Sequence, residues 1–528
     1  MRFLDVLSVL SKSSPYAVST ERQDSISAEL DEVKKYLYIE TDIQKDFESH
    51  LTSLSPGSKK IIFLCGSSGD GKSEILTQYA SKFSHKAEFH LDATHSFEPD
   101  ESAISTLDRV FSAYESSRQA LVVGINIGMM GNYVEEGSSE NVRNAIANYL
   151  DSKVSTSEYV FLNFEDYPKF DLTSAGHSSK FVKAIFNRIT KLEGNIIRQY
   201  FDREKGGDDG NKLLCTNYQL LSIPEIQDRI VDVLFKARLI KDQFLTARTL
   251  LDFIHTLLSP EGYLFDNMFD ASDNEISSKI VDFDPADIRT ENVDKFLLST
   301  SLGLPDKGFE EFKSYLSSEF GISPSKNSHS YLRLFYLLGN ADMANNYHRD
   351  FCEDFEEPLL DKYAKVWNLH THYVGDKEEK RQLKAFYKET IFSAIHTYIN
   401  RNAKSIAKGK FLISSHNGYQ IMSEVEMEPD FMAIQNASPT NTSCFVAHIS
   451  VEGKSVSMPV NINLLNMMNR IIGGYRPNKH DKNTIVILDD FADHIADIAS
   501  SKDRLTIVKG GLTISLRHDD DEIEVSGV

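Results

Sequence analysis

The stretch from residue 66 to residue 73 constrains this chain more than any other part of its sequence. It reads Gly-Ser-Ser-Gly-Asp-Gly-Lys-Ser and satisfies G-x-x-x-x-G-K-[ST], the P-loop pattern. Residues 59–65 before it are mostly apolar and β-prone, which predicts a buried strand. Residues 73–80 after it have helical spacing, with Ile75, Leu76 and Tyr79 on one face. Strand, glycine loop and helix in this order predict a phosphate-binding loop within an α/β domain.

The residue types in this loop suit a bound phosphate chain. Glycines let backbone N–H groups curl around an anion without Cβ clashes, and the N-terminus of the following helix adds partial positive charge. We expect Lys72 to reach the β- and γ-phosphates of ATP and the Ser73 hydroxyl to ligate Mg²⁺. The alternative is a Gly/Ser turn before a surface helix, and the flanking patterns argue against it. The predicted nucleotide-binding residues are Gly66, Ser67, Ser68, Gly69, Asp70, Gly71, Lys72 and Ser73.

The 528-residue chain is long enough for several domains. Strand-like runs at 87–92, 120–126 and 159–164 alternate with helical segments, which predicts a parallel sheet covered by helices, with nucleotide at the strands' C-terminal ends. The predicted fold class is an α/β P-loop NTPase with an AAA+-like parallel sheet, then a helical region and a β-rich α+β C-terminal domain. The predicted divisions are 1–55 (N-terminal helical segment), 56–177 (P-loop NTPase core), 178–265 (helical lid-like region), 266–409 (helical domain) and 410–528 (β-rich domain).

Several loops and turns are predicted outside the core. Residues 206–210 and 323–328 indicate loops within a mainly helical stretch. Gly510-Gly511, between two apolar runs, indicates a β-hairpin turn. The acidic run 519–522 indicates a solvated turn or sheet edge.

Composition limits the partners and the compartment. No run of about 18 uninterrupted apolar residues occurs, so no membrane span is predicted; the short apolar N-terminus lacks a signal-peptide cleavage site. The four cysteines show no C-x-x-C spacing, which fits a reduced cytoplasm. A net charge of −21 argues against a protein that coats DNA with its whole surface. Any DNA contact is expected to be a local basic patch or to be made through another subunit.

Hydrolysis of ATP also needs an acid that orients magnesium and a group that positions water. Asp92 ends a predicted strand and is the first choice for this acid and for a magnesium ligand. Its closeness to Lys72 leaves the alternative that it ends an ordinary second strand. Asn126 ends the next strand, where its amide could contact the γ-phosphate or the attacking water, as sensor-1 residues do in AAA+-like proteins. The alternative role of Asn126 is to cap the loop that follows.

Two other acidic pairs compete with Asp92. Glu165 and Asp166 follow the fourth predicted strand, and the alternative for them is a solvated turn. Asp489 and Asp490 follow the apolar run 485–488 and have the best pattern, but they lie far beyond the P-loop. A strand that leads into a helix N-cap explains this last pattern.

The segment 244–254 resembles the start of the lid helix that carries sensor 2 in AAA+-like ATPases. Thr246 would cap this helix, and Arg248 would point back at the phosphates, because a guanidinium group forks onto phosphate oxygens. The alternative is a surface arginine on an amphipathic helix. Histidines without metal-site spacing are His90, His95, His370 and His372.

Four runs of this sequence together resemble one known family. They are 63–76 around the P-loop, 90–97 (His-Leu-Asp-Ala-Thr-His-Ser-Phe), 124–129 (Gly-Ile-Asn-Ile-Gly-Met) and 246–254. They are similar to the DptF family, the ATPase-like component of DNA phosphorothioation-dependent restriction systems. Many unrelated families share the P-loop, and the other three runs make the resemblance specific.

The resemblance implies a role in bacterial defence, in a complex that restricts DNA lacking sulfur in its backbone. It implies DptG- and DptH-like partner subunits, and an oligomer is compatible with it. No P-D-(D/E)-x-K nuclease signature stands out, so we do not expect this chain to cleave DNA. Two alternatives stay open: a nucleotide-binding scaffold that switches shape without turnover, and a small-molecule kinase that uses the same P-loop.

Overall fold

The structure, a computed structural model, divides into two compact units. Unit 1 comprises Met1–Phe170 and Ser178–Glu356, and unit 2 comprises Asp171–His177 and Glu357–Val528. His95, Phe244, Gly511 and the middle of the predicted loops at 206–210, 323–328 and 519–522 lie outside the described residues. The described residues are 1–13, 28–55, 57–94, 101–173, 176–207, 210–243, 245–271, 274–323, 327–356, 358–403, 409–437, 443–510, 512–519 and 522–527.

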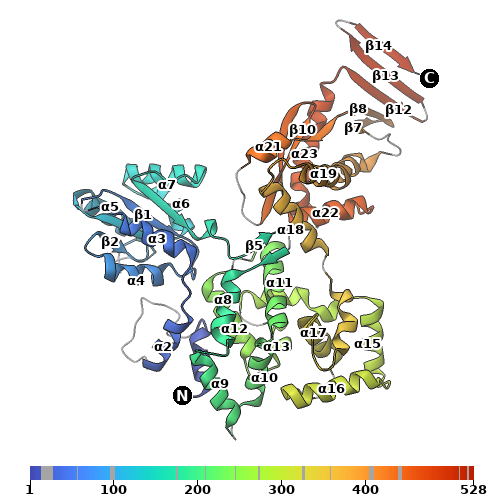
Figure 1. The fold of residues 1–528 in the computed structure, drawn as a ribbon. Helices are drawn as coiled ribbons and strands as arrows, with labels where there is room; N and C mark the ends of the chain where they lie inside the picture. The colour runs from blue at the N-terminus through green and yellow to red at the C-terminus, as the bar shows by residue number, and fades with distance from the viewer. Residues whose placement is uncertain are drawn as a thin grey trace. The chain divides into compact units, whose positions relative to one another are not determined.

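Four parallel strands form a sheet in unit 1, and Figure 1 labels two of them, β1 and β2. The strand order in this sheet is β2-β3-β1-β4. The parallel α/β sheet expected from the sequence is therefore confirmed, together with a β-rich region toward the C-terminus. The strands are β1 (Ile61–Cys65), β2 (Ala87–His90), β3 (Ala120–Ile125) and β4 (Tyr159–Asn163).

Helices cover both faces of this sheet because its central strands are apolar on both sides. Every side chain of β1 is buried. Ile62 and Leu64 pack in one apolar cluster with α3 and α4, while Phe63 packs in a second cluster with α5, α6 and α7. Successive strand residues point to opposite faces, so the continuous apolar run requires two helical layers. The helices are α3 (Asp42–Thr52), α4 (Lys72–Phe83), α5 (Ala103–Ser116), α6 (Ile127–Glu136) and α7 (Glu140–Ser152).

The rest of unit 1 is helical. The N-terminal helix is tied to it by Phe3, whose ring lies 5.9 Å from that of Phe201 and 5.3 Å from that of Tyr218. The helices are α1 (Phe3–Leu7), α2 (Ala28–Leu37), α8 (Lys180–Thr190), α9 (Ile196–Gly206), α10 (Lys212–Leu221), α11 (Pro224–Ile240), α12 (Ala247–Leu258), α13 (Leu264–Asn267), α14 (Ser277–Ile280), α15 (Glu291–Ser301), α16 (Lys307–Phe320) and α17 (Ser328–Leu338).

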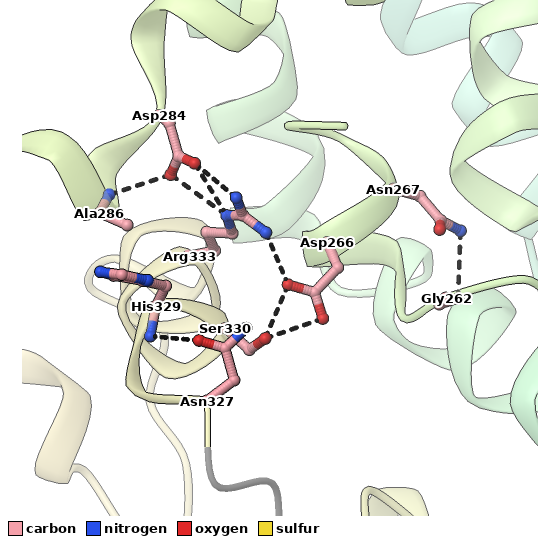
Figure 2. A network of polar contacts seen from close by, with 9 residues as sticks. All are labelled: Gly262, Asp266, Asn267, Asp284, Ala286, Asn327, His329, Ser330 and Arg333. Atoms are coloured by element: carbon pink, nitrogen blue, oxygen red, sulfur yellow. Dashed lines mark hydrogen bonds and ion pairs between the residues drawn. The ribbon is translucent and has the colours of Figure 1, made fainter. Parts of the chain in front are cut away.

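An arginine of α17 ties three segments of unit 1 together (Figure 2). The Arg333 guanidinium donates to both carboxylate oxygens of Asp284, with the shortest contact 2.6 Å from Nη2, and through Nη1 to Asp266 at 2.9 Å. Asp266 also accepts two hydrogen bonds from Ser330, and Asp284 accepts one from the backbone N–H of Ala286. Two carboxylates thus share one cation and each keeps a second donor.

Unit 2 contains a short hairpin at residues 171–177, about one third of the way along the chain, and the C-terminal third. Strand β5 (Asp171–Thr173) pairs with β6 (Gly176–Ser178) and lies next to α18 (Pro358–Thr371). The other helices are α19 (Lys377–Phe386), the π-helical turn η7 (Tyr387–Ile391), α20 (Phe392–Ile399), α21 (Phe431–Asn436), α22 (Ile462–Ile472) and α23 (Lys482–Ser500).

Two antiparallel sheets complete unit 2, in the orders β11-β10-β9 and β14-β13-β12-β8-β7. Strand β12 pairs antiparallel with β13, with Lys509 opposite Leu512. The predicted turn at Gly510-Gly511 includes Gly511, which lies outside the described residues, so this turn stays a prediction. The strands are β7 (Lys410–His416), β8 (Tyr419–Glu424), β9 (Met427–Pro429), β10 (Cys444–Val451), β11 (Lys454–Asn461), β12 (Arg504–Lys509), β13 (Leu512–Asp519) and β14 (Glu522–Gly527).

One strand prediction in this region is wrong. Residues 485–490 are not a strand but part of α23. Leu488, Phe491, Ile495 and Ala499 are its buried residues, and this is helical spacing. Asp489 therefore lies inside a helix, where it accepts a hydrogen bond from Tyr398, and does not end a strand.

The core of unit 2 contains a series of buried hydrogen bonds around His370. His370 is only 6% exposed, and its Nδ1 lies 2.8 Å from the Val366 carbonyl oxygen and its Nε2 3.1 Å from the Tyr387 hydroxyl. Since a carbonyl only accepts, Nδ1 carries the proton and Tyr387 donates to Nε2. Burial is the largest cause that lowers the pKa of His370, to about 4. The imidazole is thus held neutral by its surroundings.

Across the residue ranges given above, no helix combines the length and the apolar composition that crossing a membrane requires.

Candidate functional site

The glycine loop connects β1 to α4 with the geometry of an anion cradle. Gly69 has φ +86° and Gly71 has φ +101°, backbone angles that favour glycine. Gly71 is the N-cap of α4, and no side chain caps that helix end. The first N–H groups of a helix have no partner inside the helix. The start of α4 can therefore offer N–H groups and a partial positive charge to an anion.

Lys72 folds back over this loop. Its Nζ donates to the carbonyl oxygens of Gly66 at 2.9 Å and Ser67 at 2.6 Å. Burial is the largest effect on the pKa of Lys72 and lowers it; the charges of Asp70 and Asp92 oppose this lowering, and Lys169 adds to it. The ammonium group is thus held at the loop beside two carboxylates and a second lysine.

Asp70 braces the loop from within. Its Oδ2 accepts from the Ser67 backbone N–H at 2.7 Å, and its Oδ1 lies 2.8 Å from Lys169 Nζ. The side chains of Asp70 and Lys169 are 7% and 21% exposed. Sequence reasoning missed Lys169, because it belongs to no motif and follows β4 and the turn η2 (Phe164–Asp166) at no fixed distance from the loop.

Asp92 and Asn126 both follow strands of the parallel sheet, and the C-terminal ends of parallel strands meet at one edge. Asp92 Oδ1 accepts from the backbone N–H of Thr94 at 2.9 Å and from its hydroxyl at 2.7 Å. Asn126 caps α6, with its Oδ1 accepting from Met129 N–H at 2.6 Å. The capping role of Asn126 is thus present, while its contact with a phosphate or a water molecule stays a prediction.

The lid-like helix α12 begins directly against the loop. The backbone N–H of Arg248 donates to the Gly69 carbonyl at 3.3 Å. Thr246 is buried and caps α12 by accepting from Thr249 N–H at 3.1 Å. A Cβ on Gly69 would lie 3.0 Å from Thr246 Oγ1 and 3.1 Å from Arg248 Cβ. The structure thus brings the backbone of Arg248 to the loop, while the contact of its guanidinium group with a phosphate stays a prediction.

The competing acids have other surroundings. Glu165 and Asp166 are exposed in η2, and Tyr149 Oη lies 3.5 Å from Asp166 Oδ2. The residue is exposed as a whole, but partial desolvation of its carboxyl group is the main cause that raises the pKa of Asp166. Asp489 belongs to α23 of unit 2. Burial lowers the pKa of Lys72, and among these acids Asp92 is a leading influence that opposes this lowering.

The histidines that the structure describes have other roles than metal binding. His90 ends β2 and is buried, and His370 bonds to the backbone of its own helix. Within the part of the chain that the structure describes, no group of three or more His, Cys, Asp or Glu side chains could hold a metal ion.

The site therefore combines a loop of N–H groups, a half-buried lysine, a hydroxyl at Ser73 and a carboxylate at the sheet edge. These groups suit a phosphate chain with a hard divalent cation, because N–H groups and ammonium bind phosphate oxygens while hydroxyl and carboxylate oxygens ligate Mg²⁺. Comparison of the chain with protein-family models, with curated proteins and with solved structures gives no match.

Proposed function

We propose that residues 66–73 bind ATP with Mg²⁺ and that the chain hydrolyses it. The observation that carries this proposal is the loop itself: Gly69 and Gly71 at positive φ, an uncapped N-terminus of α4, and Lys72 half-buried with its Nζ hydrogen-bonded to the loop. The Ser73 hydroxyl and Asp92 would hold the Mg²⁺, which when bound supplies charge neutralisation on the phosphates. Arg248 would meet the phosphates from the start of α12.

The residues of the chain would share the work as follows. Loop N–H groups and Lys72 bind and orient the phosphates, and Asp92 positions the metal. Asn126, at the end of β3 between the strands that lead to the loop and to Asp92, positions the attacking water. A triphosphate would compete with the Gly66 and Ser67 carbonyls for Lys72 Nζ. Positioning and electrostatic stabilisation are the main contributions that a protein makes to phosphoryl transfer.

Calorimetric titration of ATP and a phosphate-release assay test this proposal. Lys72→Ala is expected to abolish binding and turnover, because the loop loses its cation, while the matched control Lys82→Ala, in the last turn of the same helix, keeps both. Asp92→Asn is expected to keep binding and lose turnover. Wild-type binding by Lys72→Ala would refute the site, and loss of turnover in Asp166→Asn with none in Asp92→Asn would move the acid to the end of β4.

The cellular role is a second step of the proposal and rests on the resemblance of four sequence runs to the DptF family. We propose that the ATPase acts as a subunit of a restriction complex on DNA that lacks phosphorothioate, together with DptG- and DptH-like proteins. Turnover measured with unmodified and with phosphorothioated DNA, in the presence of the partner subunits, tests this role. Equal turnover with both DNAs and without DNA would argue against it.

A non-hydrolysing nucleotide switch is the alternative that a specific observation favours. Asp92 and Asn126 already have intramolecular partners, Thr94 and the start of α6. A switch would bind ATP as tightly as proposed and release no phosphate under any of these conditions. The same two assays therefore separate the two functions.

A further inference from the structure

Lys169 is a described residue at the loop that the proposed function does not use. Its ammonium group lies 2.8 Å from Asp70 Oδ1, and Asp70 in turn accepts the Ser67 N–H with its other oxygen. The charge of Lys169 also acts on Lys72, since it contributes to the lowered pKa of that residue. Two lysines thus lie at one loop, and a carboxylate of the loop holds one of them.

We propose that Lys169 is a phosphate-sensing residue, which Asp70 holds in the nucleotide-free loop and which exchanges Asp70 for the phosphate chain when a nucleoside triphosphate binds. This inference rests on the proposed function of the loop. A bound polyphosphate attracts Lys169 and repels the Asp70 carboxylate, so the two charges of the pair respond in opposite directions. Because the side chains are 21% and 7% exposed, water screens this competition only partly.

The backbone of Lys169 links the exchange of ion-pair partners at its side chain to other segments of the chain. Its carbonyl oxygen accepts a hydrogen bond of 2.5 Å from the hydroxyl of Ser179, which is fully buried and caps α8. The chain leaves unit 1 after Phe170 and returns at Ser178, so Lys169 and Ser179 flank both crossings. A change of partner at Lys169 therefore acts on the two segments that carry the hairpin β5–β6.

The test compares two variants that break the same ion pair. Asp70→Asn keeps an oxygen for the Ser67 N–H but releases Lys169 and removes a repelling charge, so it should bind a non-hydrolysable ATP analogue more tightly. Lys169→Met leaves the Asp70 charge unbalanced at the loop and should bind the analogue more weakly, by about tenfold, the usual effect of one charge-assisted hydrogen bond. Calorimetric titration with Mg²⁺ and the analogue measures both.

The opposite signs distinguish this role from a structural brace. If the pair only stiffens the loop, both variants lose the brace, and both bind more weakly; that result overturns the inference. Lys183→Met, which breaks the exposed ion pair with Asp228, is the matched control and should bind as the wild type does. Lys72→Ala is measured alongside. If it loses binding while the Lys169 and Asp70 variants fail to show opposite signs, the nucleotide site is supported and only the inference about Lys169 is overturned.

Hydrogen exchange supplies a readout that affinity does not. On addition of the analogue to the full chain, amides of β5, β6 and the first turn of α8 should change their exchange rates in the wild type and not in Lys169→Met at saturating analogue. Unchanged rates in the wild type would refute the route through Lys169.

Discussion

Replacing Arg333 by methionine tests how much of the stability of unit 1 depends on one shared cation. The substitution removes every hydrogen bond from the guanidinium to Asp284 and Asp266 and keeps most of the apolar stem. Asp284 then retains the N–H of Ala286, and Asp266 retains the hydroxyl of Ser330 (Figure 2). Neither donor carries a charge, so two carboxylates would share a site without compensation.

The expected cost follows from the exposure of each group. Removing one partner of a buried ion pair costs about 3–5 kcal/mol, while an exposed pair is worth about 0–1 kcal/mol. The side chain of Asp284 is 9% exposed, that of Arg333 20% and that of Asp266 28%. The cost of leaving Asp284 without its cation is therefore expected near that of a buried pair, and the cost for Asp266 between those of a buried and an exposed pair. We expect Arg333→Met to lower the free energy of unfolding of unit 1 by about 3 kcal/mol.

Unfolding in guanidinium chloride, followed with two probes, measures this loss of stability. The single tryptophan, Trp367, lies in α18 of unit 2, so its fluorescence follows unit 2, while amide exchange of α17 follows unit 1. Arg333→Met should destabilise α17 and leave the tryptophan transition in place. Arg289→Met is the matched control, because its ion pair with Asp294 is exposed. If the two variants lose the same stability within about 0.5 kcal/mol, the reasoning about the shared cation is refuted.

Two further predictions concern the loop and the core of unit 2. Gly69→Ala should destabilise unit 1 more than Gly71→Ala: both residues have positive φ, which costs an alanine about 1–2 kcal/mol, but only at Gly69 would the Cβ meet Thr246, and nothing lies within 4 Å at Gly71. Amide exchange at the start of α12 checks this, and equal losses would contradict the contact. In unit 2, the pKa of His370 is lowered to about 4, so the unfolded state binds more protons between pH 6.5 and 4, and stability should fall by about 3 kcal/mol as pH decreases through that window. Tryptophan-monitored unfolding at pH 7 and pH 4.5 measures the fall, His370→Asn should flatten it, and an equally steep fall in that variant would assign it to other groups.

The parallel sheet could be predicted because its strands are continuous apolar runs. The expected strands at 59–65, 87–92, 120–126 and 159–164 each contain an observed strand, and the differences lie at the ends, where strand pairing stops and loops begin. The run 485–488 looked the same over four residues, and such a run does not distinguish a strand from a buried helix. The helical spacing of Leu488, Phe491 and Ile495 appears only in a longer window.

The candidate site was predictable where a motif fixes the local backbone. The eight loop residues needed only their pattern and their flanks, since glycine spacing and helix N-terminus are local properties. Lys169 could not be found in this way, because its place at the site depends on an ion pair with Asp70, which lies 99 residues earlier in the chain. The hairpin β5–β6 was missed because its strands have three residues each and carry no alternating pattern.

The interrupted path of the chain through unit 2 has a consequence for synthesis. The hairpin at 171–177 leaves the ribosome first, and the helix it packs against, α18, begins only at Pro358. At roughly 5–20 residues per second, the intervening residues take on the order of 10–40 s to translate. During that time α18 has not been synthesised, so the surface of the short strands that it covers stays exposed. The helices of unit 1, which precede and follow these strands in the sequence, fold in the same period. A fragment that starts at α18 would lack both strands, so the C-terminal third of this chain cannot be produced alone as a complete unit.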